Sequence, residues 1–286
     1  MITIKCGDMV LSIEPEAGGS VAALRYSGTD LLRPGPHVKP NDWNPLDYAA
    51  FPLVPFSGRI ANGRFTIGDA EFNLPANLLP EPHAIHGHGW KEVWTVDRET
   101  GNSIDLSYRH TASEWPWAYV AHQRFKLSDT ALQVDLSVRN LSSSAMPAGL
   151  GWHPYFPRDK ARLAAPTKEI WLSGNNMIPA EPTPVTESND LRSLRDVEAL
   201  NLDNAFQTDG YLSRIELADH ILEMEAEPVF KNMIVYVPPG EDYFCVEPVS
   251  HAPDAVNSNL PEDVTGLRWL NEGETLAGSI TLRLLR

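Results

Sequence analysis

YVAHQRFKLSDTALQVDLSVRN, residues 119–140, is the segment that decides the fold. Apolar side chains occupy nearly every second position in two runs, 119–127 and 131–140, and a short polar segment separates the runs. Side chains of a β-strand point alternately to opposite faces, so this period of two is typical of antiparallel strands that are covered on one face. The segment therefore predicts two adjacent strands of an antiparallel sheet.

The same pattern continues toward both ends of the chain. Turns separate short runs at spacings that are typical of a β-sandwich or barrel. The predicted strands before the segment are 2–5, 9–14, 21–26, 65–74 (a hairpin), 92–97 and 103–110, and those after it are 169–172, 214–217, 221–226, 232–237, 243–247 and 279–285. A short helix is expected near 193–200 and an ordered surface loop at 33–47. No repeat and no break in composition divides the chain, so we expect a single domain over residues 1–286.

The composition excludes several classes of partner. The 286 residues include 42% hydrophobic side chains, enough for a large core, and the formal net charge is -15. Such a charge repels nucleic acid and anionic membrane surfaces. Two cysteines, Cys6 and Cys245, are too few for a disulfide framework, and the N-terminus has no apolar signal-peptide core. We therefore expect a cytoplasmic protein that binds neither nucleic acid nor membranes.

Residues 149–156, GLGWHPYF, place one histidine among aromatic rings. The flat faces of Trp152 and Tyr155 are of the kind against which sugar rings pack. Pro154 removes a backbone donor, which predicts a strand end or a loop around His153. His153 is thus a candidate proton donor or acceptor, and the alternative is a structural histidine bonded to backbone under an aromatic cluster.

Two further segments carry candidate binding residues. Arg59 follows an apolar run, so it is expected either to pair with a carboxylate or to face a polar cavity. Residues 83–90, HAIHGHGW, contain three histidines, of which His86 and His88 would share a face on a strand. A third metal ligand has no recognisable spacing, so we predict no metal and a hydrogen-bonding role for His86.

Two acidic residues complete the set. Asp203 lies in the polar segment NLDNAF, residues 201–206, where it is either a functional carboxylate or a turn former. Glu247 lies in CVEP, residues 245–248, and strand alternation puts it on the same face as Cys245 and Tyr243. Desolvation on an apolar face would raise the pKa of this carboxyl and make it a better general base. The alternative is a structural salt bridge, for example with Arg59.

Together these segments resemble the aldose 1-epimerase, or mutarotase, family in family order over most of the chain. The resemblance implies a large antiparallel β-supersandwich with no metal or organic cofactor. It places the family's catalytic acid on His153, its catalytic base on Glu247, and its substrate-binding residues on Arg59, His86 and Asp203. Gly58 departs from the asparagine that the family often has before the arginine.

The resemblance implies an enzyme that interconverts the α and β anomers of a free monosaccharide, as a monomer or weak homodimer. Three alternatives stay open: a hexose-6-phosphate epimerase, which needs additional cationic residues; a non-catalytic sugar-binding protein; and an auxiliary domain of a polysaccharide lyase, for whose catalytic domain the chain has no room.

Overall fold

The segment 119–140 forms β12 (Tyr119–Leu127) and β13 (Ala131–Asn140), which pair in antiparallel register from Tyr119↔Asn140 to Leu127↔Leu132. The computed structural model describes residues 1–37, 41–174 and 176–285. Strands make up about 50% of the chain and helices 7%. The predicted all-β class, with large antiparallel sheets, is therefore confirmed.

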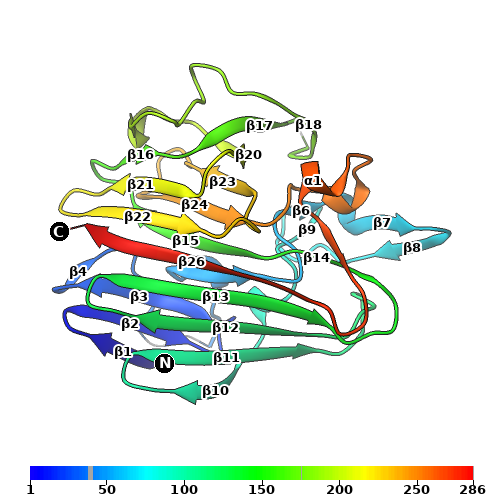
Figure 1. Cartoon of the computed structure of the whole chain (residues 1–286), viewed down its shortest axis with the longest axis horizontal. Helices are drawn as coiled ribbons and strands as arrows, with labels where there is room; N and C mark the ends of the chain where they lie inside the picture. Colours follow the sequence, from blue (N-terminus) through cyan, green and yellow to red (C-terminus); the bar gives the residue numbers. More distant parts are fainter. Residues whose placement is uncertain (38–40, 175, 286) are drawn as a thin grey trace.

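Within the described residues, β12 and β13 belong to a nine-stranded sheet, and an eleven-stranded sheet forms the second layer (Figure 1). The nine-stranded sheet has the order β10 (Thr95–Glu99), β11 (Ser103–His110), β12, β13, β26 (Thr275–Leu285), β22 (Ile221–Ala226), β21 (Leu212–Glu216), β16 (Arg162–Ala164), β19 (Arg195–Asp196). The eleven-stranded sheet has the order β1 (Ile2–Cys6), β2 (Met9–Glu14), β3 (Ser20–Tyr26), β5 (Ala50–Leu53), β15 (Gly151–Pro157), β24 (Tyr243–Val249), β23 (Asn232–Tyr236), β20 (Asp203–Thr208), β17 (Thr167–Ser173), β18 (Pro179–Pro184), with β4 (Thr29–Asp30) on β3.

Short elements join and cover these sheets. Three two-stranded ladders pair β6 (Arg59–Ile60) with β9 (Ala84–Ile85), β7 (Arg64–Ile67) with β8 (Ala70–Asn73), and β14 (Met146–Ala148) with β25 (Arg268–Leu270). The helical elements are α1 (Glu262–Thr265) and the 3₁₀ turns Pro45–Asp47, Ala61–Gly63, Gly89–Lys91, Val197–Ala199 and Ala255–Asn257.

Each strand in the middle of the larger sheet sends alternate side chains into two different apolar clusters. Trp152, Phe156 and Phe244 join the main core, which also contains residues of the nine-stranded sheet. Tyr155 and Cys245 lie in a second cluster on the other face. The nine-stranded sheet does not cover that second face, so side chains there can line a cavity.

Several predicted elements differ from the structure. Residues 193–200 form the short strand β19 and the 3₁₀ turn Val197–Ala199 instead of a helix, because Arg195 pairs with Leu163 of β16. The strand expected at 92–97 is β10, Thr95–Glu99, an exposed edge strand. In the loop 33–47, residues 38–40 lie outside the described part.

The segment around His153 also differs. Residues 151–157 form the central strand β15 instead of a strand end or loop. Its ladder with β24 is formed at Gly151↔Val249 and from Tyr155↔Cys245 onward, and the stretch in between contains two prolines, Pro154 and Pro248. Proline has no N–H to donate to a ladder, so these two residues are tolerated where the strands do not bond.

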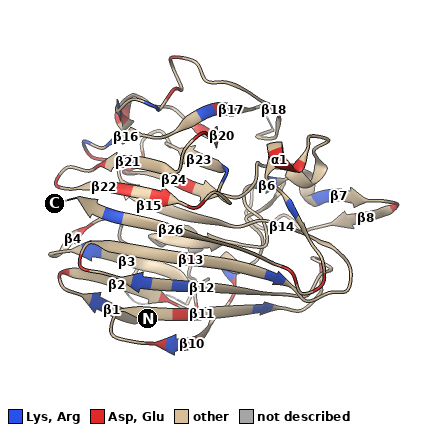
Figure 2. Ribbon diagram, viewed as in Figure 1, with Lys and Arg blue, Asp and Glu red and all other residues tan. Residues whose placement is uncertain are grey.

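Charged side chains are spread over strands and loops, with acidic residues on α1 and at the β7–β8 turn (Figure 2). In the described part of the chain, no helix is long and apolar enough to span a membrane.

Candidate active site

Neighbouring strands of the larger sheet bring the predicted histidine and carboxylates to one cavity. Tyr155 of β15 pairs with Cys245 of β24, and Glu247 of β24 pairs with Ile234 of β23. On the next strand, Asp203 of β20 pairs with Tyr236 of β23. All of these residues except Cys245 line a cavity of about 190 Å³, which also receives residues of the β6 and β9 ladder. Of the residues predicted for the site, it contacts His153, Glu247, Arg59, His86, Asp203 and Tyr155. Since one water needs about 10–15 Å³, this space is large enough for a small organic molecule.

His153 and Glu247 form a buried pair at the floor of this cavity. His153 Nε2 lies 3.3 Å from Glu247 Oε1, and the side chains are 7% and 2% exposed. Glu247 Oε2 is buried without a hydrogen-bond partner among the described residues. This oxygen is therefore available to accept a hydrogen bond from a molecule in the cavity.

Burial disfavours the charged form of both groups. Desolvation lowers the pKa of His153 to about 3, with a smaller contribution from the Arg33 charge. Desolvation raises the pKa of Glu247 well above its usual 4.5, and the nearby Asp203 carboxylate raises it further, whereas Arg59 opposes the shift. Because the pKa of the histidine is lowered and that of the carboxyl is raised, the pair holds one proton between the two values, and the distance of 3.3 Å lets the proton move between the residues.

Aromatic rings fix the orientation of the His153 imidazole. The Tyr155 ring stacks on it at 4.7 Å and 18°, and the Phe51 ring lies 4.6 Å away. The guanidinium of Arg33 covers the other side of Tyr155, 4.0 Å from the ring centre, and reaches Tyr243 at 4.5 Å. The sequence reasoning missed Arg33, although a charge directly after the buried pair Leu31 and Leu32 is the same signal that identified Arg59.

Arg59 satisfies both sequence expectations at once. Its Nε lies 2.5 Å from Glu81 Oε1, and its side chain also lines the cavity. The expected alternative partner, Glu247, is instead paired with His153. The cavity thus contains an arginine whose charge is already balanced by a carboxylate.

Asp203 is the first residue of β20, so the interpretation as a turn former is wrong. Its carboxyl lines the cavity, and desolvation raises its pKa above 3.8, with Arg59 acting in the opposite direction. A carboxylate that lines such a cavity is a ready acceptor for ligand hydroxyl groups.

Trp152 does not belong to the site, which corrects the prediction that it binds substrate. Alternation along β15 places it on the face opposite His153, where it is 0% exposed in the core between the sheets. Tyr155, two residues away from His153, does line the cavity.

We expect Trp152→Phe to lower the free energy of unfolding by about 1–3 kcal/mol, because the smaller ring leaves a void in the core. Urea unfolding measures this change. An unchanged stability together with an altered affinity of the cavity for its ligand would place the indole at the site after all.

The expectation that His86 and His88 share a face is also wrong. His86 faces the cavity, whereas His88 stacks on His110 at 4.8 Å and 10°. Among the described residues, one group has the spacing of metal ligands, namely His153, Cys245 and Glu247, with ligand atoms within 4.8 Å of one another. Burial raises the pKa of the Cys245 thiol well above 9.0, so the thiolate that binds metals is strongly disfavoured there.

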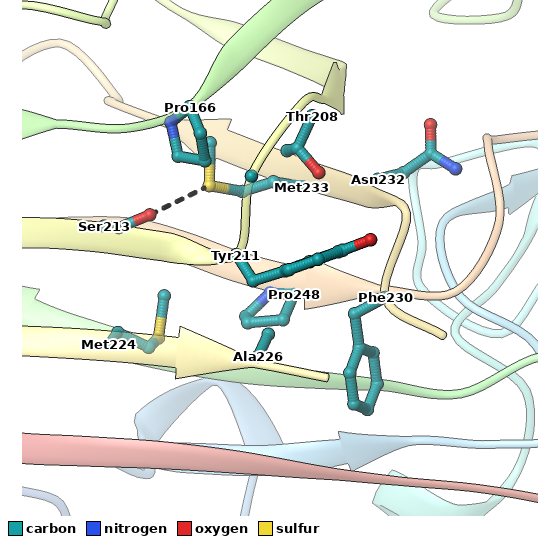
Figure 3. A pocket seen from close by; sticks show the side chains of 11 residues that line it. Pro166, Thr208, Tyr211, Ser213, Met224, Ala226, Phe230, Asn232, Met233 and Pro248 are labelled. Carbon is teal, nitrogen blue, oxygen red and sulfur yellow. Dashed lines mark hydrogen bonds between the residues drawn. The ribbon is translucent and has the colours of Figure 1, made fainter. Parts of the chain in front are cut away.

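A second cavity, of about 20 Å³, is lined by residues of both sheets, among them Met224 and Met233 (Figure 3). Its volume corresponds to about one water. Its lining residues carry no charge, and Ser213 Oγ already donates to the sulfur of Met233. This cavity has neither the size nor the groups for a reaction.

The sandwich of two antiparallel sheets and the buried histidine–glutamate pair define an all-β protein with a candidate acid–base site on one face of the larger sheet. The sequence model of the aldose 1-epimerase family matches residues 1–283, and the chain belongs to this family. The uncharacterized protein YphB of Escherichia coli K12 is 29% identical over 99% of this chain and 98% of its own length. The uncharacterized protein YihR of the same organism is 25% identical over 91% and 86%.

Solved structures show the same fold. A galactose mutarotase-like protein from Clostridium acetobutylicum superposes with a TM-score of 0.87 at 22% identity, over 99% of this chain and 94% of that one. The galactose 1-epimerase from Lactobacillus acidophilus NCFM superposes with a TM-score of 0.80 at 16% identity, over 99% and 93%. The predicted family and galactose mutarotase-like fold are therefore confirmed.

Proposed function

We propose that this protein is an aldose 1-epimerase that interconverts the α and β anomers of a free monosaccharide. The observation that carries the proposal is the His153–Glu247 pair, 3.3 Å apart at a cavity of about 190 Å³. Membership of the aldose 1-epimerase family supports it.

The reaction needs one acid and one base at a single carbon. One group removes the proton of the C1 hydroxyl while the other protonates the ring oxygen, and the bond between C1 and the ring oxygen breaks. The open-chain aldehyde then turns about its C1–C2 bond, and closure on the opposite face of the carbonyl reverses both proton transfers. The number of protons on the protein is the same before and after each turnover, so a pair that holds one proton is sufficient.

The positions of the remaining residues suit this chemistry. Glu247 acts as the base toward the C1 hydroxyl, and His153 protonates the ring oxygen, each at about 2.6–3.2 Å from its oxygen. Arg59 and Asp203 line the cavity, where they bind ring hydroxyls and keep the aldehyde from escaping. His86 donates a hydrogen bond to the same region, and Tyr155 forms the wall behind the acid.

Two features favour a free sugar over a hexose 6-phosphate. Among the described lining residues, Arg59 is the one lysine or arginine, and Glu81 already balances its charge. Asp203 and Glu247 line the same space. A phosphate group would have to enter beside two carboxyl groups without a free cation, which is unfavourable.

A non-catalytic sugar-binding protein explains the site less well. Aromatic walls and hydroxyl partners suffice for binding, whereas binding alone does not need a buried histidine 3.3 Å from a buried carboxyl.

The test is magnetisation exchange between the α and β anomeric protons, measured by NMR on equilibrated aldoses and on glucose 6-phosphate with catalytic amounts of protein. We expect faster exchange for free sugars than for the phosphate. Faster exchange for the phosphate alone would overturn the choice of substrate, and no effect on any sugar would overturn the activity.

The pKa directions of the pair predict the pH profile of kcat/KM. The active state holds one proton, so activity falls at low pH when the pair takes a second proton and at high pH when it loses its proton. Burial lowers the pKa of His153 from 6.5 to about 3, so the acid limb lies well below the range of an unperturbed histidine. We expect kcat/KM to show no acid limb near pH 6.5 and to fall on the alkaline side as the Glu247 carboxyl, whose pKa is raised by burial, loses its proton. A decline centred near pH 6.5 would contradict the shared-proton state.

A further inference from the structure

His86 has a strained backbone conformation that requires stabilising contacts from the surrounding chain. Its φ is 62°, in the left-handed region that residues with a side chain rarely adopt, and the following Gly87 has a φ of 68°. For a residue other than glycine this conformation is strained, and it persists only where surrounding contacts impose it. Strain of this kind at a cavity-lining residue indicates that the orientation of its imidazole ring toward the cavity is important for function.

The contacts that impose it come from Asn77. Its Oδ1 accepts the Ile85 N–H at 2.8 Å, and its Nδ2 donates to the Ile85 carbonyl at 2.8 Å and to the Gly87 carbonyl at 3.2 Å. One carboxamide therefore clamps the backbone on both sides of His86. Asn77 is itself anchored, because Lys91 Nζ donates to its carbonyl oxygen.

Gly58 determines which nitrogen of His86 faces a ligand, once the backbone of residues 85–87 is held in place. The Gly58 N–H donates to His86 Nδ1 at 3.2 Å, and the His86 N–H donates to the Gly58 carbonyl at 2.9 Å. Nδ1 is thus an acceptor, and burial holds the pKa of His86 well below 6.5. The ring is neutral with its proton on Nε2, and Nε2–H is the donor that it offers to the cavity.

Further contacts connect the same clamp to Arg59. Ile85, whose N–H and carbonyl both bond to Asn77, is the register partner of Arg59 in the β6–β9 ladder. Four residues after Asn77, Glu81 pairs with the Arg59 guanidinium. The segment 77–81 thus supports both residues that we assign to the sugar hydroxyls on this side of the cavity.

We propose that Asn77 is a positioning residue that holds the backbone of residues 85–87 so that His86 presents Nε2–H to the sugar. Asn77 does not line the cavity and acts through His86. The inference rests on the proposed function for the identity of the ligand, and on the geometry alone for the role of the clamp.

A matched control exists elsewhere in the fold. Asn140, at the end of β13, makes the same set of bonds: its Oδ1 accepts the Ser142 N–H, and its Nδ2 donates to the carbonyls of Ser144 and Leu270, all at 2.8 Å. It belongs to the nine-stranded sheet and does not contact the cavity. Asn140→Ala therefore removes an equivalent loop clamp without touching the site.

The kinetic experiment compares Asn77→Ala, His86→Ala, their double variant and Asn140→Ala. We expect Asn77→Ala to lower kcat/KM by about tenfold to a hundredfold, since a small displacement of a donor costs that much. If Asn77 acts through His86, the double variant is no slower than His86→Ala. Asn140→Ala lowers the thermal midpoint and leaves kcat/KM unchanged. Additive losses, or an unaffected Asn77→Ala, would overturn the proposal. Asn77→Asp, which keeps the acceptor and loses both donated bonds, replaces the alanine variant if the latter does not fold.

A second readout needs no activity. Two-bond ¹H–¹⁵N spectra of histidine-labelled protein distinguish the two neutral tautomers, and His86→Gln assigns the His86 signals. We expect wild-type His86 to be a single, pH-invariant Nε2–H tautomer, and Asn77→Ala to show mixed tautomers or a titrating ring. An unchanged His86 spectrum in Asn77→Ala would overturn the positioning role. Loss of the tautomer in a protein that epimerises no sugar would leave the clamp established and the proposed function refuted.

Discussion

Glu247→Gln is expected to lower kcat/KM for free aldoses by about a hundred- to ten-thousandfold, which corresponds to about 3–5 kcal/mol of lost transition-state stabilisation. The amide has the shape of the carboxyl group but cannot accept the proton of the C1 hydroxyl. Its effect is therefore on proton transfer, while the cavity and its hydroxyl-binding residues are retained. Polarimetry at several sugar concentrations measures kcat and KM separately.

The control for this variant is Glu223→Gln on β22, which removes the same charge from a strand of the other sheet. It should leave kcat/KM within about twofold of the wild type, as expected of a substitution away from the site. Glu247→Gln should also keep the wild-type circular dichroism spectrum. Full activity of a folded Glu247→Gln protein would show that the carboxyl is structural.

His153→Gln is the second variant for which a large loss is expected, of about a hundred- to ten-thousandfold in kcat/KM. Glutamine can still donate a hydrogen bond to the ring oxygen but cannot transfer a proton to it. The measurement is again polarimetric. His110→Gln, which replaces a buried histidine of the nine-stranded sheet, serves as the control and should reduce stability without reducing kcat/KM.

The double variant of His153 and Glu247 distinguishes a pair from two independent groups. If the two residues share one proton, either substitution already abolishes the same proton transfer. We therefore expect the double variant to be about as slow as the slower single variant. Losses that multiply would show that each residue handles its own proton, contrary to the shared-proton state inferred from their distance of 3.3 Å.

The fold was largely predictable because strand periodicity survives in the local sequence. The runs 103–110, 119–127 and 131–140 have the predicted bounds, since each lies in the middle of a sheet with one covered face. Prediction failed where tertiary pairing overrides local preference. Arg195 and Asp196 look helical by pattern but form β19 against β16. Residues 151–157 continue through Pro154 because the ladder with β24 has no pairs between Gly151↔Val249 and Tyr155↔Cys245, so no N–H of Pro154 is needed there.

The site was predictable as a set of residues but not as a geometry. Alternation along β24 placed Glu247 on the cavity face, and the same rule applied to β15 would have turned Trp152 away from His153 had that segment been identified as a strand. The pairing of Arg59 with Glu81, the stacking of Arg33 on Tyr155 and the clamp of Asn77 on His86 join residues through loops. No sequence periodicity encodes such contacts, so only the structure shows them.

The most direct test of the central claim is the optical rotation of freshly dissolved α-D-galactose, α-D-glucose and L-arabinose, followed over time with the wild-type protein and in buffer alone. The acid–base pair at the cavity predicts that the protein accelerates the approach to the equilibrium rotation for at least one of these sugars and leaves the final value unchanged. A folded protein that leaves the rate of every free sugar at its buffer value would contradict the assignment of His153 and Glu247 as a mutarotase pair.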